Sequence, residues 1–182
     1  MAVDDEITQY AVRAADGDRH AAERFVATTK GPLHRLLTYL SDPGSAEDLV
    51  QETYLRAFGS LRGYEGRSPA RTWLFAIARN VAADHLRARK RRPPTSATAV
   101  PESAATAPDH GRLVALHALV AGLDAERREA FVLTQLLGLS YAEAAEVCGC
   151  AVGTIRSRVF RARDELTRAV GGEEDQAVSS TR

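Results

Sequence analysis

The chain has 182 residues, of which 45% are apolar and 26% are charged, and its formal net charge is zero. This composition can bury one core of ordinary size or two small ones. The sequence holds no run of about 18 apolar residues and no secretory signal at its start, so we expect a cytoplasmic protein without membrane insertion.

The neutral total hides a separation of charge along the chain. Residues 67–92 hold eight Lys or Arg side chains and one acid, whereas residues 1–66 hold eleven acids and seven basic side chains. This separation predicts two binding surfaces of opposite charge. The two cysteines and five histidines show no metal-ligand spacing, and no P-loop or nucleophile elbow occurs. We therefore expect no metal, no cofactor and no enzymatic activity.

The spacing of apolar residues predicts an all-α protein of two small helical domains joined by a flexible linker. Helices are expected over residues 5–16, 20–40, 45–60, 69–91, 111–121, 124–137, 140–148 and 152–168. Residues 93–109 hold four of the seven prolines and lack apolar periodicity, which is the composition of a linker. The predicted organisation is a domain over 1–92, a linker over 93–109, a domain over 110–170 and a frayed tail over 171–182.

Two helix starts have the form of a capping box, in which a Ser side chain and an acid three residues later bond to each other's backbone N–H groups. The first is "SAED" at Ser45–Asp48, which follows the turn-forming "DPG". The second is "SYAE" at Ser140–Glu143.

The helix expected around "AEDLVQETYLRAF" has one acidic side, formed by Glu47, Asp48, Gln51 and Glu52. The prediction for its other side is Val50, Tyr54, Leu55 and Phe58. Acids near a helix start are favourable in any protein, and Glu52 with Arg56 could form a surface pair. The same acids could dock on a basic protein surface. Residue spacing leaves both interpretations open.

A glycine-rich loop, "LRGYEGRS", is followed by a basic helix that ends in "RARKRR". We expect the core face of this helix to hold Trp73, Leu74, Ile77, Ala78 and Val81. The predicted outer face offers Arg79, Asn80, Asp84 and Arg87, with Arg91 in the terminal cluster. Cations complement a helix C-terminus, but five in six positions favour a phosphate-binding surface. Tyr64 in the loop could hold an unstacked base or anchor the loop on the core, and both interpretations stay open.

The stretch "GTIRSRVFRARDEL" predicts a helix that is both basic and amphipathic. Its core stripe comprises Ile155, Val159, Ala162 and Leu166. The opposite side displays Thr154, Ser157, Phe160, Arg161 and Asp164, flanked by Arg156, Arg158 and Arg163. Because a short capped helix and a glycine-containing turn precede it, we expect a helix-turn-helix in which the flanking arginines reach phosphates. Ser157 and Arg161 would address base edges. The alternative is a solvated basic helix with a stray aromatic residue.

Four segments, in order and around a linker, resemble the extracytoplasmic-function (ECF) sigma factors of bacterial RNA polymerase, group 4 of the sigma-70 family. They are "AEDLVQETYLRAF", "ARTWLFAIARNVAADHLR", "LLGLSYAEAAEVCGC" and "VGTIRSRVFRARDEL". The resemblance covers residues 8 to 168. One departure is Ala151, where many members carry proline.

This resemblance implies a role for each surface in promoter-specific transcription initiation. Asp48, Gln51 and Glu52 would dock on the clamp coiled coil of the largest polymerase subunit, and the flap is a second implied contact. The implied residues for reading and melting the −10 element of promoter DNA are Tyr64, Arg79, Asn80, Asp84, Arg87 and Arg91. Those for the −35 element are Thr154, Arg156, Ser157, Arg158, Phe160, Arg161 and Arg163. An anti-sigma partner is also implied. The rival is a one-component helix-turn-helix regulator, which leaves the acidic and basic helices without a purpose.

Overall fold

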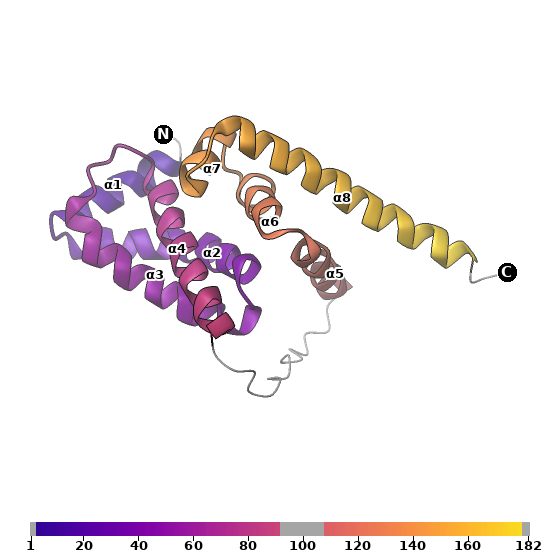
Figure 1. Ribbon diagram of the computed structural model, residues 1–182. Helices are drawn as coiled ribbons and strands as arrows, with labels where there is room; N and C mark the ends of the chain where they lie inside the picture. The colour runs from indigo at the N-terminus through magenta and orange to yellow at the C-terminus, as the bar shows by residue number, and fades with distance from the viewer. Residues whose placement is uncertain (1–2, 92–107, 180–182) are drawn as a thin grey trace. The chain divides into compact units, whose positions relative to one another are not determined.

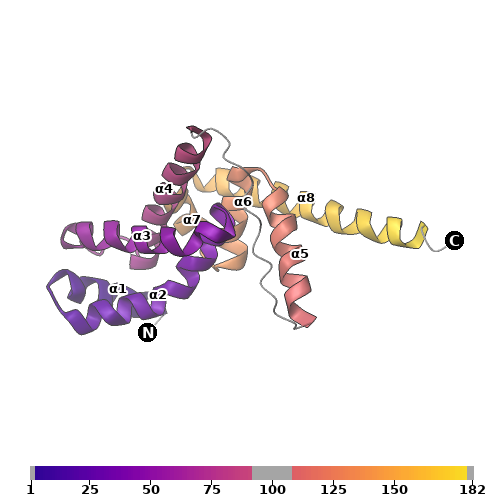
Figure 2. The same ribbon diagram turned by 90° about the horizontal axis from the view of Figure 1, so that it is seen from below.

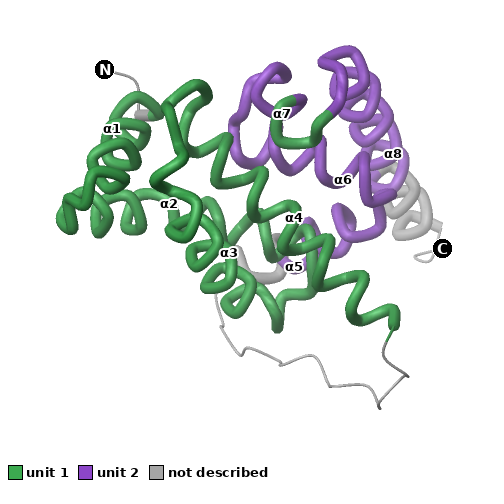
Figure 3. The backbone as a smooth tube through the Cα atoms, turned by 60° about the vertical axis from the view of Figure 1, so that its left-hand side comes forward, with its two compact units in different colours: residues 1–101, 146–149 green, residues 102–145, 150–182 purple. Residues whose placement is uncertain are grey.

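The computed structural model describes residues 3–91 and 108–179, and every element within them is helical (Figure 1). The linker predicted over 93–109 therefore lies outside the described residues, apart from its last two. The chain divides into two compact units. Residues 1–101 and 146–149 form the first, and residues 102–145 and 150–182 form the second (Figure 3). The protein is all-α, as predicted.

Four α-helices build the first unit, and two of them lie at its centre. They are α1 (Val3–Ala15), α2 (Arg19–Leu40), α3 (Ala46–Ser60) and α4 (Ala70–Arg91). The central helices α2 and α4 each pack against all three others. Their buried faces supply the largest core side chains, which are Phe25, Leu33, Leu36, Leu37, Leu74 and Phe75.

The core face of α4 is rotated from the predicted one. Leu74, Ala78 and Val81 are buried as expected, but Trp73 and Ile77 are only half-buried. Phe75 and Ala82 are buried instead, with Thr72 and Ala70. The reason is that α4 packs against three helices, so its buried face is broader than the single stripe that periodicity predicts.

A capping box at Ser45 was predicted wrongly. Ser45 makes no side-chain bond to the start of α3. Its hydroxyl donates to both oxygens of Asp42, and its N–H donates to Asp42 Oδ1 at 3.1 Å. Asp42 thereby caps the short 3₁₀ helix Pro43–Ser45 that leads into α3. The ionised carboxylate is the stronger acceptor, so it takes both donors of Ser45.

The remaining α-helices are α5 (Pro108–Gly122), α6 (Ala125–Phe131), α7 (Tyr141–Cys148) and α8 (Val152–Ser179), which belong to the second unit except for the last three residues of α7 (Figure 2). Where one helix was predicted over 124–137, α6 instead continues into a π-helical segment, Val132–Leu136. The capping box of α7 is confirmed, because Ser140 N–H donates to Glu143 Oε2 at 2.7 Å and Glu143 N–H donates to Ser140 Oγ at 3.2 Å.

Helix α8 runs to Ser179, past the end that the sequence predicted at residue 168. The segment beyond Val170 contains no proline, and its Glu, Gln and Ala residues favour a helix enough to tolerate two glycines. Residues 180–182 of the predicted tail lie outside the described residues. Within 3–91 and 108–179, no helix has the length and apolarity needed to cross a membrane.

Candidate nucleic-acid interface

A tight turn joins α7 to α8 and sets the start of the basic helix. Gly149 has a φ of +63°, a conformation that favours glycine. Its N–H donates to Glu146 O at 3.2 Å, and the N–H of Cys150 donates to Ala145 O at 3.0 Å. These two bonds form the Schellman motif that ends a helix. The carbonyl of Ala151 then accepts from Thr154 N–H at 2.9 Å, which begins α8. The predicted helix-turn-helix is therefore present.

The two sides of α8 differ as the sequence predicted. Ile155, Val159 and Ala162 are buried, while Leu166 is half-buried. On the opposite side Phe160 is 73% exposed, although it is a large apolar side chain. The other outward residues are Ser157, Arg161 and Asp164, which are exposed, and Thr154, which is half-buried. The Ser157 hydroxyl donates to Thr154 O at 3.0 Å, so its lone pairs remain available as acceptors.

The arginines of α8 fall into two groups. Arg156 and Arg161 are exposed and form no ion pair with any residue in the described part of the chain. Arg158 pairs with Glu126, and its Nη1 lies 3.7 Å from Cys150 Sγ; its side chain is only 19% exposed. Arg163 is exposed but donates to Gln135 Oε1. The predicted set is thus divided into unpaired and held guanidinium groups.

The outer face of α4 is linked to α3 by ion pairs. Asp84 accepts from Arg56 at 2.8 Å and from Arg87 at 2.6 Å, and Arg56 also donates to Glu52 at 2.7 Å. The bonds from Arg56 and Arg87 lower the pKa of Asp84 below its ordinary value. The predicted residues Asp84 and Arg87 are therefore partnered with each other. Among the rest of the predicted set, Asn80 and Arg91 are exposed and Arg79 is half-buried.

Tyr64 has the contacts of a loop anchor. Its hydroxyl donates to Ser68 O at 2.6 Å, and its ring lies against Trp73 with the centroids 4.9 Å apart. Burial raises the pKa of the Tyr64 phenol. Of the two interpretations left open by the sequence, this geometry favours the anchor. The exposed residues of the loop are those on either side of it, namely Arg62, Gly63, Glu65, Gly66 and Arg67.

The acidic side of α3 also carries an apolar residue. Asp48 and Gln51 are exposed, Glu52 is half-buried, and Glu47 is paired with Lys30 at 3.0 Å. Leu55, predicted for the core side, is 71% exposed. The spacing of 48, 51, 52 and 55 brings these residues onto one face. Val50 is buried as predicted, and Ala46, Leu49, Thr53 and Ala57 complete the core side. Thr53 tolerates burial because its hydroxyl donates to Leu49 O at 2.7 Å.

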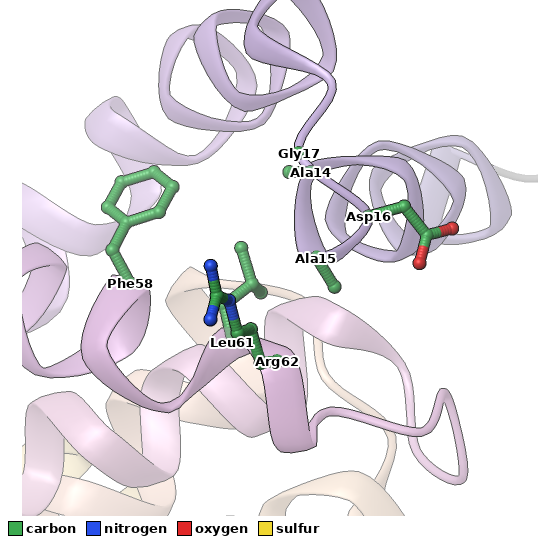
Figure 4. A pocket seen from close by; sticks show the side chains of 7 residues that line it. All are labelled: Ala14, Ala15, Asp16, Gly17, Phe58, Leu61 and Arg62. Carbon is green, nitrogen blue, oxygen red and sulfur yellow. The ribbon is translucent and has the colours of Figure 1, made fainter.

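Each unit has a shallow pocket within the described residues. In the first unit, Phe58 of α3 faces the turn between α1 and α2 across a hollow of about 330 Å³ (Figure 4). In the second, an apolar groove of about 390 Å³ runs between α5 and α8. Its lining is Ala115, Ala118, Leu119, Gly122, Leu123, Glu165, Leu166 and Ala169. Neither pocket contains a residue that the sequence analysis assigned to a site.

Several residues at these surfaces escaped sequence reasoning. Leu55 lies one turn after Glu52 and two turns after Asp48, which places it on the acidic face, but its hydrophobicity favours the core, so local pattern gave no clear signal of its exposure. The partners Gln135 and Glu126 of the α8 arginines carry no local signal, since each lies about thirty residues from its arginine.

Comparison with known proteins agrees with this geometry. Residues 25–92 match the family described as "Sigma-70 region 2", and residues 113–166 match "Sigma-70, region 4". The ECF RNA polymerase sigma factor SigC of Mycobacterium tuberculosis is 53% identical over 167 residues, which are 90% of both chains.

Two solved structures are also similar. CnrH, in complex with the cytosolic domain of CnrY, has a TM-score of 0.74 and 27% identity over 92% of this chain and 98% of its own. The sigma factor RpoE of Bartonella quintana, in complex with the anti-sigma factor NepR, has a TM-score of 0.69 and 32% identity over 82% and 96%. A region 2 fold joined to a region 4 helix-turn-helix defines a sigma factor. This chain belongs to the ECF sigma factors of bacterial RNA polymerase, group 4 of the sigma-70 family, and is a DNA-binding transcription initiation factor.

Proposed function

We propose that this sigma factor binds core RNA polymerase and reads the −35 element with α8, while the Leu61–Pro69 loop and α4 read and melt the −10 element. One observation carries the proposal. The outward face of α8 presents two unpaired arginines and an exposed phenylalanine directly after a helix-turn-helix turn. No solvated surface gains from exposing Phe160, whereas a thymine methyl or a sugar would cover it.

Base reading at −35 is assigned to the centre of this face. Arg161 can donate two parallel bonds to a guanine edge, and Ser157 accepts from a base amino group. Arg156 and Thr154 border these residues and reach the phosphates of the groove walls. The exposure of all but Thr154 supports this assignment.

Opening of the −10 element is assigned to α4 together with the loop before it. Asn80 and Arg91 face solvent, and Asp84 keeps Arg87 at the same side of the helix. Because Tyr64 closes the loop onto Ser68 and Trp73, its role is to shape the loop. The exposed loop residues around it would then receive the unstacked base, which offsets the few kcal/mol that unstacking costs.

Docking on polymerase is assigned to the face of Asp48, Gln51, Glu52 and Leu55, which offers acids around an apolar centre. This combination fits a basic helical surface such as the clamp coiled coil. The groove between α5 and α8 is assigned to the flap, because small residues in α5 let a helix approach closely. The two complexed relatives support an anti-sigma partner for this chain as well. These roles place the protein in the cytoplasm, with the polymerase.

A pull-down with core RNA polymerase, followed by transcription from a promoter library, tests the proposal. We expect the full chain to bind core polymerase and to direct transcripts from a defined subset of promoters. A one-component regulator would bind its DNA without core polymerase and would direct no transcription. That result would overturn the proposal.

The melting role has its own test. Replacing Asn80 and Tyr64 by alanine should leave closed-complex binding largely intact, because the −35 face remains. Permanganate reactivity of thymines near the start site should fall, and a pre-melted −10 bubble should restore transcription. The variant Tyr64→Phe keeps the ring against Trp73 and loses only the bond to Ser68, so it should open promoters better than Tyr64→Ala. Normal opening by the Asn80/Tyr64 double variant would overturn the assignment of α4 and the loop to −10 opening.

A further inference from the structure

Two arginines of α8 are held by side chains from the α6 region, and the two holders differ in charge. Arg158 is held by the carboxylate of Glu126, whereas Arg163 is held by the amide oxygen of Gln135. A carboxylate cancels the charge of the guanidinium that it binds. An amide restricts the position of the guanidinium and leaves its charge in place. Arg163 therefore presents a full positive charge at a restricted position.

Gln135 is itself fixed by a chain of hydrogen bonds. Its Nε2 donates to Thr134 Oγ1 at 2.9 Å, and the buried Thr134 hydroxyl donates to Ala130 O at 2.7 Å. With its NH₂ group engaged in this way, its oxygen faces Arg163. Thr134 and Gln135 both lie in the π-helical segment Val132–Leu136, which ends with a bond of 3.0 Å from Leu137 N–H to Val132 O. Such segments are rare and occur frequently at functional sites.

We propose that Gln135 is a positioning residue for Arg163, and that the pair forms a phosphate contact ordered before DNA arrives, beside the −35 face. This inference rests on the proposed function. An arginine that is already ordered loses less side-chain freedom on binding. Its remaining N–H donors stay available for a phosphate, because Gln135 takes only one of them. Arg158, by contrast, joins α8 to α6 through Glu126, whose carboxylate cancels its charge.

The test measures promoter affinity as a function of KCl concentration, using holoenzyme assembled from core RNA polymerase and the full chain. The DNA is a promoter fragment selected from a random library by the unmodified holoenzyme. Gln135→Met removes the acceptor but keeps the size of the side chain. We expect affinity to fall about two- to tenfold, the cost of ordering one side chain, with an unchanged salt slope. Arg163→Met should weaken binding and make the slope shallower by about 0.9, the value for one phosphate.

Two further variants separate positioning from a merely structural role. Gln135→Glu still holds Arg163 but cancels its charge, so it should weaken binding with a shallower salt slope. In the Arg163→Met background, Gln135→Met should cause no further loss. An equal loss in both backgrounds would overturn the proposal, and so would an unchanged slope for Arg163→Met.

The variant Arg161→Ala separates this inference from the proposed function. If Arg161→Ala changes the preference among −35 sequences but Arg163→Met leaves affinity and slope unchanged, the Gln135 inference alone fails. If the holoenzyme selects no promoter, or if both variants leave binding unchanged, the −35 role of α8 fails with it. A helical circular dichroism spectrum for each variant confirms that the loss does not come from unfolding.

Discussion

The exposed faces of α3 and α8 have the same layout and opposite charge. In α3, acidic and amide side chains lie beside Leu55, which is 71% exposed; in α8, arginines and Ser157 lie beside Phe160, which is 73% exposed. An apolar centre with a charged border is typical of a surface that a partner covers. The sign of the border would then select the partner, which under the proposed function is a basic protein surface for α3 and DNA for α8. A chain with no net charge can thus hold two sites that do not compete for one ligand.

The two faces also differ in how firmly their charges are held. On α3, Glu52 shares Arg56 with Asp84 of α4, so the acidic border belongs to a network. On α8, Arg156 and Arg161 face solvent without an ion pair in the described ranges. A network fixes the geometry of a rigid protein contact, whereas unpaired arginines can follow the edges of different bases. Substitutions of charged residues on the α3 face should therefore abolish polymerase binding, and those on the α8 face should change which −35 sequences are preferred.

The largest effect is expected from reversing the charge of the α3 face. The double variant Asp48→Arg/Glu52→Arg should weaken core polymerase binding by several kcal/mol, since it sets like charges against each other in a desolvated contact. Competition binding with labelled core enzyme measures the loss. The matched control is Asp5→Arg/Asp16→Arg, which makes the same charge change at two exposed acids outside the face. If the control loses as much affinity, the net charge of the first unit and not the α3 face governs docking.

Base preference at −35 tests the α8 face. Replacing Arg161 by alanine should change the preference among −35 variants by about 1–3 kcal/mol, the range for a bidentate base contact. Arg168, paired with Asp164 one turn away, is the control, and Arg168→Ala should leave the preference unaltered. Binding to a library of −35 variants gives both values. A uniform loss over all sequences would make Arg161 a phosphate contact.

Leu55 and Phe160, the exposed apolar residues of the two faces, allow a paired test with a smaller expected effect. We expect Leu55→Ser to cost about 1–2 kcal/mol in core binding and nothing in −35 affinity. Phe160→Ser should do the reverse, with a comparable loss. Because both side chains are largely exposed, neither change should lower the unfolding temperature. Equal losses of core and DNA binding in both variants would remove the distinction between the faces.

The smallest expected effect is on stability, and it concerns Asp42, an acid of the first unit with a structural role. Burial alone would raise the pKa of Asp42, but the hydrogen bonds from Ser45 and the charges of Arg89 and His85 outweigh it and lower the pKa below 3.8. A lowered folded-state pKa adds stability above the unfolded value, and this is lost as the pH falls through the folded value. Asp42→Asn should therefore be less stable at neutral pH, by up to about 1 kcal/mol. The difference should vanish in acid.

Urea unfolding of both proteins between pH 7 and pH 3 measures this dependence. Core binding at neutral pH should be unchanged in Asp42→Asn, in contrast to the Asp48/Glu52 variant. A stability difference that does not shrink as the pH falls below 3.8 would assign the effect to the shape of the side chain and not to its charge.

Most of the helices, and the outward face of α8, could be predicted from local patterns. The Ile155, Val159 and Ala162 stripe repeats at helical spacing, and the Ser140–Glu143 capping box needs only four residues. Local patterns failed where tertiary packing determines which side chains are buried. Leu55 is exposed because small or satisfied residues, Ala57 and Thr53, fill the core side of α3. A helical wheel weighted by hydrophobicity places leucine inward and threonine outward, so it gives the opposite result.

The partners that lie far away in the sequence could not be predicted, whereas the local pair of Glu52 with Arg56 was among the sequence-based possibilities and forms. Arg56 meets Asp84, and Arg163 meets Gln135, each across 28 residues of chain. Such pairs depend on how helices pack, which no short window contains. The anchor role of Tyr64 is similar, because it depends on the position of Trp73 at the start of the next helix. Sequence thus indicates which faces are exposed and charged, and leaves open which side chains on them are restrained.

The contact between Tyr64 and Trp73 gives the molecule an internal optical reporter. Trp73 is the only tryptophan of the chain, and the ring of Tyr64 lies 4.9 Å from it. Its emission therefore comes from a single place, the junction of the loop with α4. Any rearrangement that separates the two rings would change the wavelength and the quenching of this emission. The loop assigned to the −10 element can thus be followed in real time by fluorescence, without a label, in the free chain.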